Sequence, residues 1–229
     1  MGVHLGLIGG IGPAATEYYY RQLVASHTRA GHRLELTIAH ADVNELLQNL
    51  RMDARQVQAH IFRDIAYRLQ AGGANVVAIT SIAGHFCLRE FEAVSPIPVV
   101  DALDAIRHEL LRRSVRTVGV LGTEAAMTSH LFGGLEGFDV RVPAAEMAGR
   151  TDREYVTMAR AGRASDAQRA FFIEAGHALH EAGAEVVLLA GTDLFLAFDG
   201  RDCGVTTLDC AAIHVNALTV VSMSSASST

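Results

Sequence analysis

The sequence predicts an α/β protein built from two Rossmann-like domains, each with a parallel sheet. Short apolar runs rich in Val and Ile alternate with longer stretches of helical periodicity, the pattern of parallel strands joined by crossover helices. The same order of motifs occurs twice along the chain. With 229 residues, 50% of them hydrophobic, the chain can bury one large core or two smaller ones.

Six apolar runs are the predicted strands, and helices fill most of the gaps between them. One helical stretch carries Val57, Ile61, Ile65 and Leu69 at a spacing of four residues, which places them on one face. The strands are expected at residues 3–8, 34–39, 76–80, 115–121, 140–143 and 185–190.

Three pairs of segments show the internal repeat, and the members of each pair lie about 110 residues apart. Each half contains a strand with a glycine turn, then a Gly-Ala strand, then a strand leading into a helix that begins at Asp. The pairs are 3–9 with 116–122, 73–77 with 183–187, and 100–106 with 208–213.

The repeat also predicts where a ligand binds. If the halves pack about a pseudo-twofold axis, equivalent strand ends face each other across a cleft, and ligands of open α/β sheets gather at such ends. Position 81 then lies opposite position 191. We expect residues 80–81 and 190–193 to bound one site.

Composition argues against several classes of protein. The net charge is −6 and no basic block is present, which disfavours a nucleic-acid partner. All 19 basic residues are arginines, so no lysine can form a Schiff base with pyridoxal phosphate or serve a P-loop. The three cysteines lack metal-ligand spacing, and no 18-residue apolar run is present. We expect a cytoplasmic protein without a metal, a cofactor or a membrane span.

A glycine-rich turn, Gly9 to Gly12, follows the first strand and precedes a helix, which is the setting of an anion-binding nest. The turn also fits the G-x-G-x-x-A form of a dinucleotide fingerprint, so an NAD(P)-dependent dehydrogenase is a distant alternative. Pro13 is foreign to that motif, and neither Glu35 nor Asp42 has the spacing of its ribose-binding acid. A purely structural turn is a further alternative.

Five ordered motifs together resemble the aspartate/glutamate racemase superfamily, whose members need no cofactor. They are 9–20 with its Gly-Gly-Ile-Gly-Pro turn and three tyrosines, 73–85, 121–128, 183–193 and 209–214. The resemblance implies an N-terminal domain of residues 1–98 plus 209–229, a second domain of residues 99–208, and a homodimer.

Members of this superfamily deprotonate the carbon alpha to a carboxylate with one thiolate and reprotonate its opposite face with a second thiol. At the matching positions this chain has Ser81 and Gly191, and Ile82 and Ala83 replace the carboxylate-binding Asn and Thr. A serine hydroxyl is a far weaker acid than a thiol, and glycine has no side chain. We infer that the two-thiol reaction is lost and that the pocket is more apolar beside Ser81.

The remaining polar residues near these strand ends are the candidate site. The predicted catalytic residues are Asp193, His85, Ser81 and Thr192. The predicted substrate-binding residues are Gly9, Gly10, Gly12, Thr123, Met127 and Gly191. Each has a structural alternative: Ser81 and Asp193 as helix N-caps, and His85 as a polar residue at a helix start.

The predicted function is that of a cofactor-independent, racemase-like enzyme acting at the carbon alpha to the carboxylate of a small acid or amino acid. Two alternatives stay open. One is a one-sided lyase, decarboxylase or cyclase on a less polar acid, which needs a single proton donor. The other is a carboxylate-binding protein without catalysis.

Overall fold

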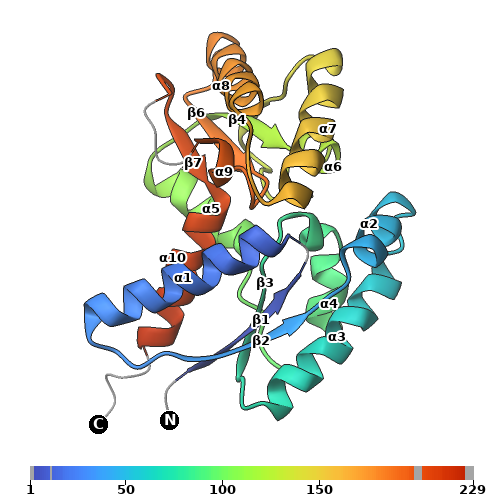
Figure 1. Ribbon diagram of the computed structural model, residues 1–229, viewed down its shortest axis with the longest axis vertical. Coiled ribbons are helices and arrows are strands. Elements are labelled where there is room, and N and C mark those ends of the chain that lie inside the picture. Colours follow the sequence, from blue (N-terminus) through green and yellow to red (C-terminus); the bar gives the residue numbers. More distant parts are fainter. Residues whose placement is uncertain (1–2, 11, 199–202, 225–229) are drawn as a thin grey trace. The chain divides into compact units, whose positions relative to one another are not determined.

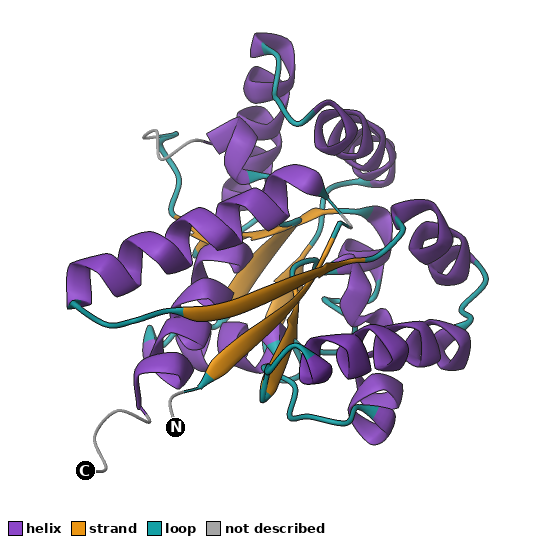
Figure 2. Cartoon of the chain, turned by 60° about the horizontal axis from the view of Figure 1, so that its bottom comes forward, coloured by secondary structure: helices purple, strands orange, loops and turns teal. Residues whose placement is uncertain are grey.

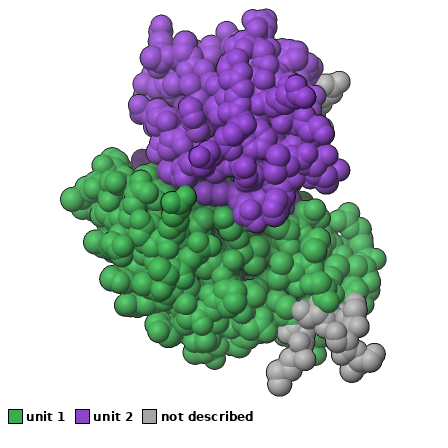
Figure 3. Space-filling model, turned by 180° about the vertical axis from the view of Figure 1, so that it is seen from behind, with its two compact units in different colours: residues 1–102, 214–229 green, residues 103–213 purple. Residues whose placement is uncertain are grey.

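The computed structural model describes residues 3–10, 12–198 and 203–224. Its contacts divide the chain into two compact units (Figures 1 and 3). Unit 1 comprises Met1–Ala102 with His214–Thr229, and unit 2 comprises Leu103–Ile213. Each unit holds one parallel sheet, and Figure 2 shows the strands with helices packed around them.

The sheet of unit 1 has the order β2-β1-β3 and is parallel throughout. Its strands are β1 (His4–Gly9), β2 (Glu35–His40) and β3 (Val76–Ile79). A parallel bridge between Val77 and Val99 extends the sheet beyond β3. The helices are α1 (Pro13–Ala30), α2 (Val43–Arg51), α3 (Arg55–Ala71), the 3-10 helix η1 (Ala83–Cys87) and α4 (Leu88–Val94).

The sheet of unit 2 has the order β5-β4-β6-β7 and is also parallel. Its strands are β4 (Thr117–Gly122), β5 (Asp139–Arg141), β6 (Val186–Ala190) and β7 (Thr207–Asp209). The remaining helices, in chain order, are α5 (Ala102–Arg112), α6 (Glu124–Thr128), α7 (Ala145–Ala161), α8 (Asp166–Glu181), α9 (Phe195–Phe198) and α10 (Cys210–Ser224). Helix α10 begins in unit 2, and its residues from His214 onward belong to unit 1.

The predicted fold class and the repeat of motifs are confirmed. All six predicted strands are present, with ends that differ by no more than two residues. The two sheets have equivalent strand orders, and the Val77–Val99 bridge corresponds to the pairing of Val187 with Thr207. Strand β7 was not among the six predicted apolar runs, but the repeat predicted a strand leading into the helix that begins at Asp209, and β7 is that strand.

A close approach between a helix and the central strand is repeated in both units. A Cβ atom on Gly6 of β1 would lie 3.0 Å from the Cβ of Ala74 and 3.2 Å from that of Leu69. In unit 2, a Cβ on Gly119 of β4 would lie 3.1 Å from the Cβ atoms of both Ala184 and Leu179. These contacts are tighter than ordinary packing, so the central strand needs glycine at this point.

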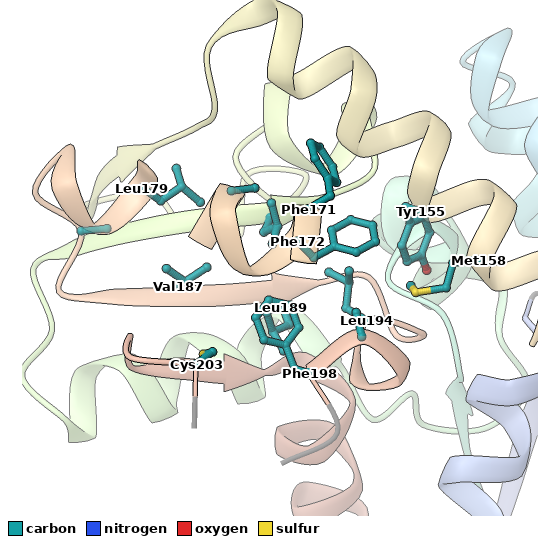
Figure 4. Close-up of a cluster of buried hydrophobic side chains, with 14 residues drawn as sticks. Tyr155, Met158, Phe171, Phe172, Leu179, Val187, Leu189, Leu194, Phe198 and Cys203 are labelled. Carbon is teal, nitrogen blue, oxygen red and sulfur yellow. The ribbon is translucent and has the colours of Figure 1, made fainter. Parts of the chain in front are cut away.

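One apolar cluster of unit 2 lies between the sheet and helices α7, α8 and α9 (Figure 4). Phe172 and Met158 are fully buried in it. Tyr155 of α7 lies at the edge of this cluster beside Met158 (Figure 4). Among the helices in the described part of the chain, none is long and apolar enough to cross a membrane.

We expect Gly119→Ala to lower the free energy of unfolding by about 1–3 kcal/mol, because the added methyl group overpacks the contact with Leu179 and Ala184. Urea denaturation followed by circular dichroism measures this. The matched control is Gly149→Ala in α7, where the nearest atom to the new Cβ is 3.5 Å away. There alanine should stabilise by about 0.5–1 kcal/mol. A Gly119→Ala variant as stable as the parent would contradict the close-approach argument.

Candidate active site

The glycine-rich turn of unit 1 is held by hydroxyl groups. The Gly10 N–H donates to Oγ1 of Thr16 over 3.0 Å, and that oxygen lies 3.2 Å from Oγ1 of Thr80. Thr80 in turn donates to the carbonyl of Ile8. One N–H of the predicted nest is therefore already bound within the unit. Ligand binding by Gly9, Gly10 and Gly12 stays a prediction, and Ile11 lies outside the described residues.

Ser81 and His85 come together after β3. Both are buried, with 4% and 2% of their surface exposed. His85 Nδ1 lies 2.7 Å from the Ser81 carbonyl oxygen, which can only accept, so Nδ1 carries the proton. Burial lowers the pKa of His85, against the opposing charge of Asp101. The ring is neutral at pH 7, and its basic lone pair is on Nε2.

That Nε2 atom has no hydrogen-bond partner among the residues that the structure describes. A buried nitrogen without a partner carries a desolvation cost of about 1–3 kcal/mol, so a water or ligand donor would find it favourable. The predicted cap at Ser81 is absent: Ile82 occupies the cap position of η1, and no side chain caps that helix.

His214 of α10 packs beside His85, with ring centroids 6.0 Å apart. Its Nδ1 lies 2.9 Å from the Tyr19 hydroxyl and its Nε2 lies 2.9 Å from the Val100 carbonyl oxygen. Burial, followed by the neighbouring His85, lowers the pKa of His214 to about 3. His214 is a neutral link between α1, α10 and the end of the Val99 bridge, and it was not among the predicted site residues.

In unit 2, Gly191, Thr192 and Asp193 directly follow β6 and are buried. The Tyr155 hydroxyl of α7 donates to Oδ2 of Asp193 over 3.2 Å. Burial, and then the charge of Asp193, raise the pKa of Tyr155 well above its ordinary value, while a hydrogen bond from Thr192 acts in the opposite direction. The phenol therefore stays protonated at neutral pH.

Tyr155 was not predicted as a site residue. It lies in the middle of an amphipathic helix, about 36 residues before Gly191, and no motif joins the two. A Cβ atom on Gly191 would lie 2.4 Å from Cε2 of Tyr155 and 2.7 Å from its Cζ. Only the contact itself identifies this residue as part of the site.

The Thr123 loop is also satisfied from within unit 2. Thr123 caps α6, since its Oγ1 accepts from the Ala126 N–H over 3.2 Å. The Glu124 N–H donates to Oδ1 of Asp152 over 2.9 Å. Met127 is buried in α6. Substrate contacts of Thr123 and Met127 stay predictions.

The cysteines near these strand ends are poor sources of thiolate. Burial raises the pKa of Cys87 to about 12, and burial beside Asp209 raises that of Cys210 well above its ordinary value. Within the described ranges, no group of three or more His, Cys, Asp or Glu side chains is placed to hold a metal ion.

The fold is that of the racemases: an Asp/Glu racemase candidate from Yersinia pestis superimposes with a TM-score of 0.82 at 23% identity, over 95% of this chain and 97% of the other. An aspartate racemase homologue from Pyrococcus horikoshii gives 0.77 at 28% identity, over 96% and 99%. Arylmalonate decarboxylase also has this fold, with 0.55 at 16% identity over 95% and 92%.

The Asp/Glu/hydantoin racemase family matches residues 8–218, nearly the whole chain. The chain belongs to this family. Its position 81 is Ser, not Cys, and its position 191 is Gly.

The buried carboxyl of Asp209, at the end of β7, should make the stability of the fold depend on pH. Burial raises its pKa to about 6, although its Oδ1 accepts from the Ala211 N–H over 2.8 Å. Because the folded-state pKa is the higher one, this carboxyl stabilises the fold below pH 4 and loses that contribution as the pH rises through 6.

We expect Asp209→Asn, which can still cap α10, to gain stability relative to the parent between pH 4 and pH 7. The gain should be up to about 3 kcal/mol. Urea denaturation at the two pH values measures it. A difference between variant and parent that is independent of pH would rule out the raised pKa.

Proposed function

We propose that this chain catalyses proton transfer at the carbon alpha to the carboxylate of a small acid, without the two thiols of its relatives. The observation that carries the proposal is the Asp193 carboxylate. It is fully buried, it follows the second thiol position by two residues, and it accepts a hydrogen bond from a phenol that stays protonated. Buried carboxylates with a defined partner are typical general acids and bases.

Each unit contributes one set of groups to the proposal. From unit 2, Asp193 moves the proton and Thr192 donates a hydrogen bond. From unit 1, Ser81 donates a hydrogen bond, and the neutral His85 ring offers Nε2 as an acceptor. The glycine turn and the Thr123 loop, by the family resemblance, bind the substrate carboxylate.

A one-sided reaction is the second candidate, and a specific observation favours it. Among the described residues, the buried carboxylate next to a thiol position of the family is that of Asp193 in unit 2, whereas unit 1 has the Ser81 hydroxyl at its thiol position. Racemisation needs an acid/base group on each face of the carbon, but decarboxylation or elimination needs a single proton donor. The shared fold of arylmalonate decarboxylase is compatible with this reaction class.

The first test is incubation of the purified protein in D2O with both enantiomers of aspartate and glutamate, 5-substituted hydantoins and 2-substituted malonates, followed by proton NMR. We expect deuterium to enter the alpha carbon of one class. Entry with inversion indicates a racemase, and entry with loss of CO2 indicates the one-sided enzyme. Silence across the panel, combined with carboxylate-dependent thermal stabilisation, would favour the non-catalytic alternative.

We expect Asp193→Asn to lower kcat/KM for the identified reaction by about 100-fold or more, because the amide cannot exchange a proton at neutral pH. The fold should survive, since the amide oxygen still accepts from Tyr155. The control is Asp166→Asn, an exposed position at the start of α8. Unchanged turnover in a folded Asp193→Asn variant would eliminate this residue as the acid/base.

We also propose a homodimer from the family resemblance, and a cytoplasmic location from the cysteine usage of the sequence. Sedimentation equilibrium of the full chain measures the assembly state directly, and a monomer at all concentrations would contradict the proposal.

A further inference from the structure

At the end of β6, the space beside Gly191 is not left empty. Glycine in place of cysteine at position 191 would leave a space of about the volume of a side chain. That space would either hold water or stay empty, and either outcome would lower stability. Here the Tyr155 ring lies in that space, because a Cβ on Gly191 would be 2.4 Å from Cε2 and 2.7 Å from Cζ. No side chain fits at position 191 while Tyr155 keeps its place.

The same tyrosine holds the neighbouring carboxylate. Its hydroxyl donates to Oδ2 of Asp193 over 3.2 Å, and only 9% of Tyr155 and none of Asp193 is exposed. The ring is fixed by the apolar cluster around Met158 and Leu194 (Figure 4). A carboxylate held by a buried, rigid donor is fixed in one orientation, which proton transfer requires.

We propose that Tyr155 takes the place of the second thiol: its ring fills the space at Gly191, and its hydroxyl positions the Asp193 carboxylate that moves the proton. Tyr155 is a positioning residue in this scheme, since its own proton stays on the phenol and the transferred proton moves on and off Asp193. The part concerning proton transfer rests on the proposed function, whereas the filled space and the hold on Asp193 do not.

The filled space is tested by a stability cycle. We expect Gly191→Ala to lower Tm by about 5 °C in the parent and in Tyr155→Phe, which keeps the ring, but by less than about 1 °C in Tyr155→Ala. Equal losses in all three backgrounds would overturn the claim that the ring excludes a side chain at position 191. Differential scanning calorimetry provides the readout without any substrate.

The hold on Asp193 is tested by a second stability cycle. Tyr155→Phe should decrease stability in the parent. In Asp193→Ala, where the phenol has lost its acceptor, the same change should be neutral or stabilising. A coupling of at least about fivefold in the unfolding equilibrium constant is expected. Additive effects would overturn the hydrogen bond as an interaction that holds the carboxylate.

Positioning for proton transfer is tested on the substrate that the D2O panel identifies. Tyr155→Phe should lower kcat by about 10- to 100-fold with little change in KM. It should also move upward the limb of the pH profile that Asp193 sets, because the carboxylate loses a donor. The control is Tyr67→Phe on the exposed face of α3, which should change neither. An unchanged kcat and pH profile in Tyr155→Phe would overturn the positioning role while leaving the proposed function intact.

If the parent protein reacts with none of the compounds in the D2O panel, that result would count against the proposed function. The two stability cycles would then decide the place of Tyr155 by themselves. The two failures are therefore distinguishable.

Discussion

The close approach of a helix to the central strand is the constraint on which both units depend. In each, a glycine in the middle of the first strand faces a Leu near the end of the second long helix and the Ala of the following Gly-Ala turn. This contact sets how closely the helix packs on the sheet, at the point where the chain turns into the next strand. Gly6 pairs with Val77 of β3, and Gly119 pairs with Val187 of β6. Ser81 and Gly191 each come four residues later, so they have equivalent positions in their own sheets.

The strand ends show a second common feature, which is that their polar groups are largely satisfied within each unit. Thr16 accepts from the Gly10 N–H of the glycine turn, and Thr80 donates to the Ile8 carbonyl just before it. Asp152 accepts from the start of α6, and His214 joins Tyr19 to the Val100 carbonyl. Such bonds rigidify a site at the cost of groups that could have bound a ligand. The Nε2 atom of His85 is the exception among the described residues. A hydrogen-bond donor from a water or a ligand would therefore bind favourably to this atom, because it would remove the cost of the unpaired nitrogen.

The sequence was sufficient for the fold because the signals for it are local and repeated. Alternating apolar runs, a glycine turn and an Asp at each final helix start are short patterns, and each occurs twice. The grouping of Ser81 with His85, and of Gly191 with Asp193, follows from their nearness along the chain. Tyr155 could not be predicted in this way. It comes from a helix whose apolar stripe predicts only a core position, and its hydroxyl acquires a role through a contact that spans 38 residues.

The two positions at which the family resemblance implies a thiol differ from each other in physical terms. In unit 1 that position is Ser81, whose hydroxyl is small and polar but a far weaker acid than a thiol. In unit 2 that position is Gly191, where the Tyr155 ring occupies the place of a side chain and brings its hydroxyl to the Asp193 carboxylate. The strand ends after β3 and β6 therefore carry chemically different groups. A stereoinverting proton transfer needs an acid/base group on each face of the carbon. Under the function proposed above, the difference between the two strand ends is therefore compatible with a one-sided reaction in which Asp193 alone moves the proton.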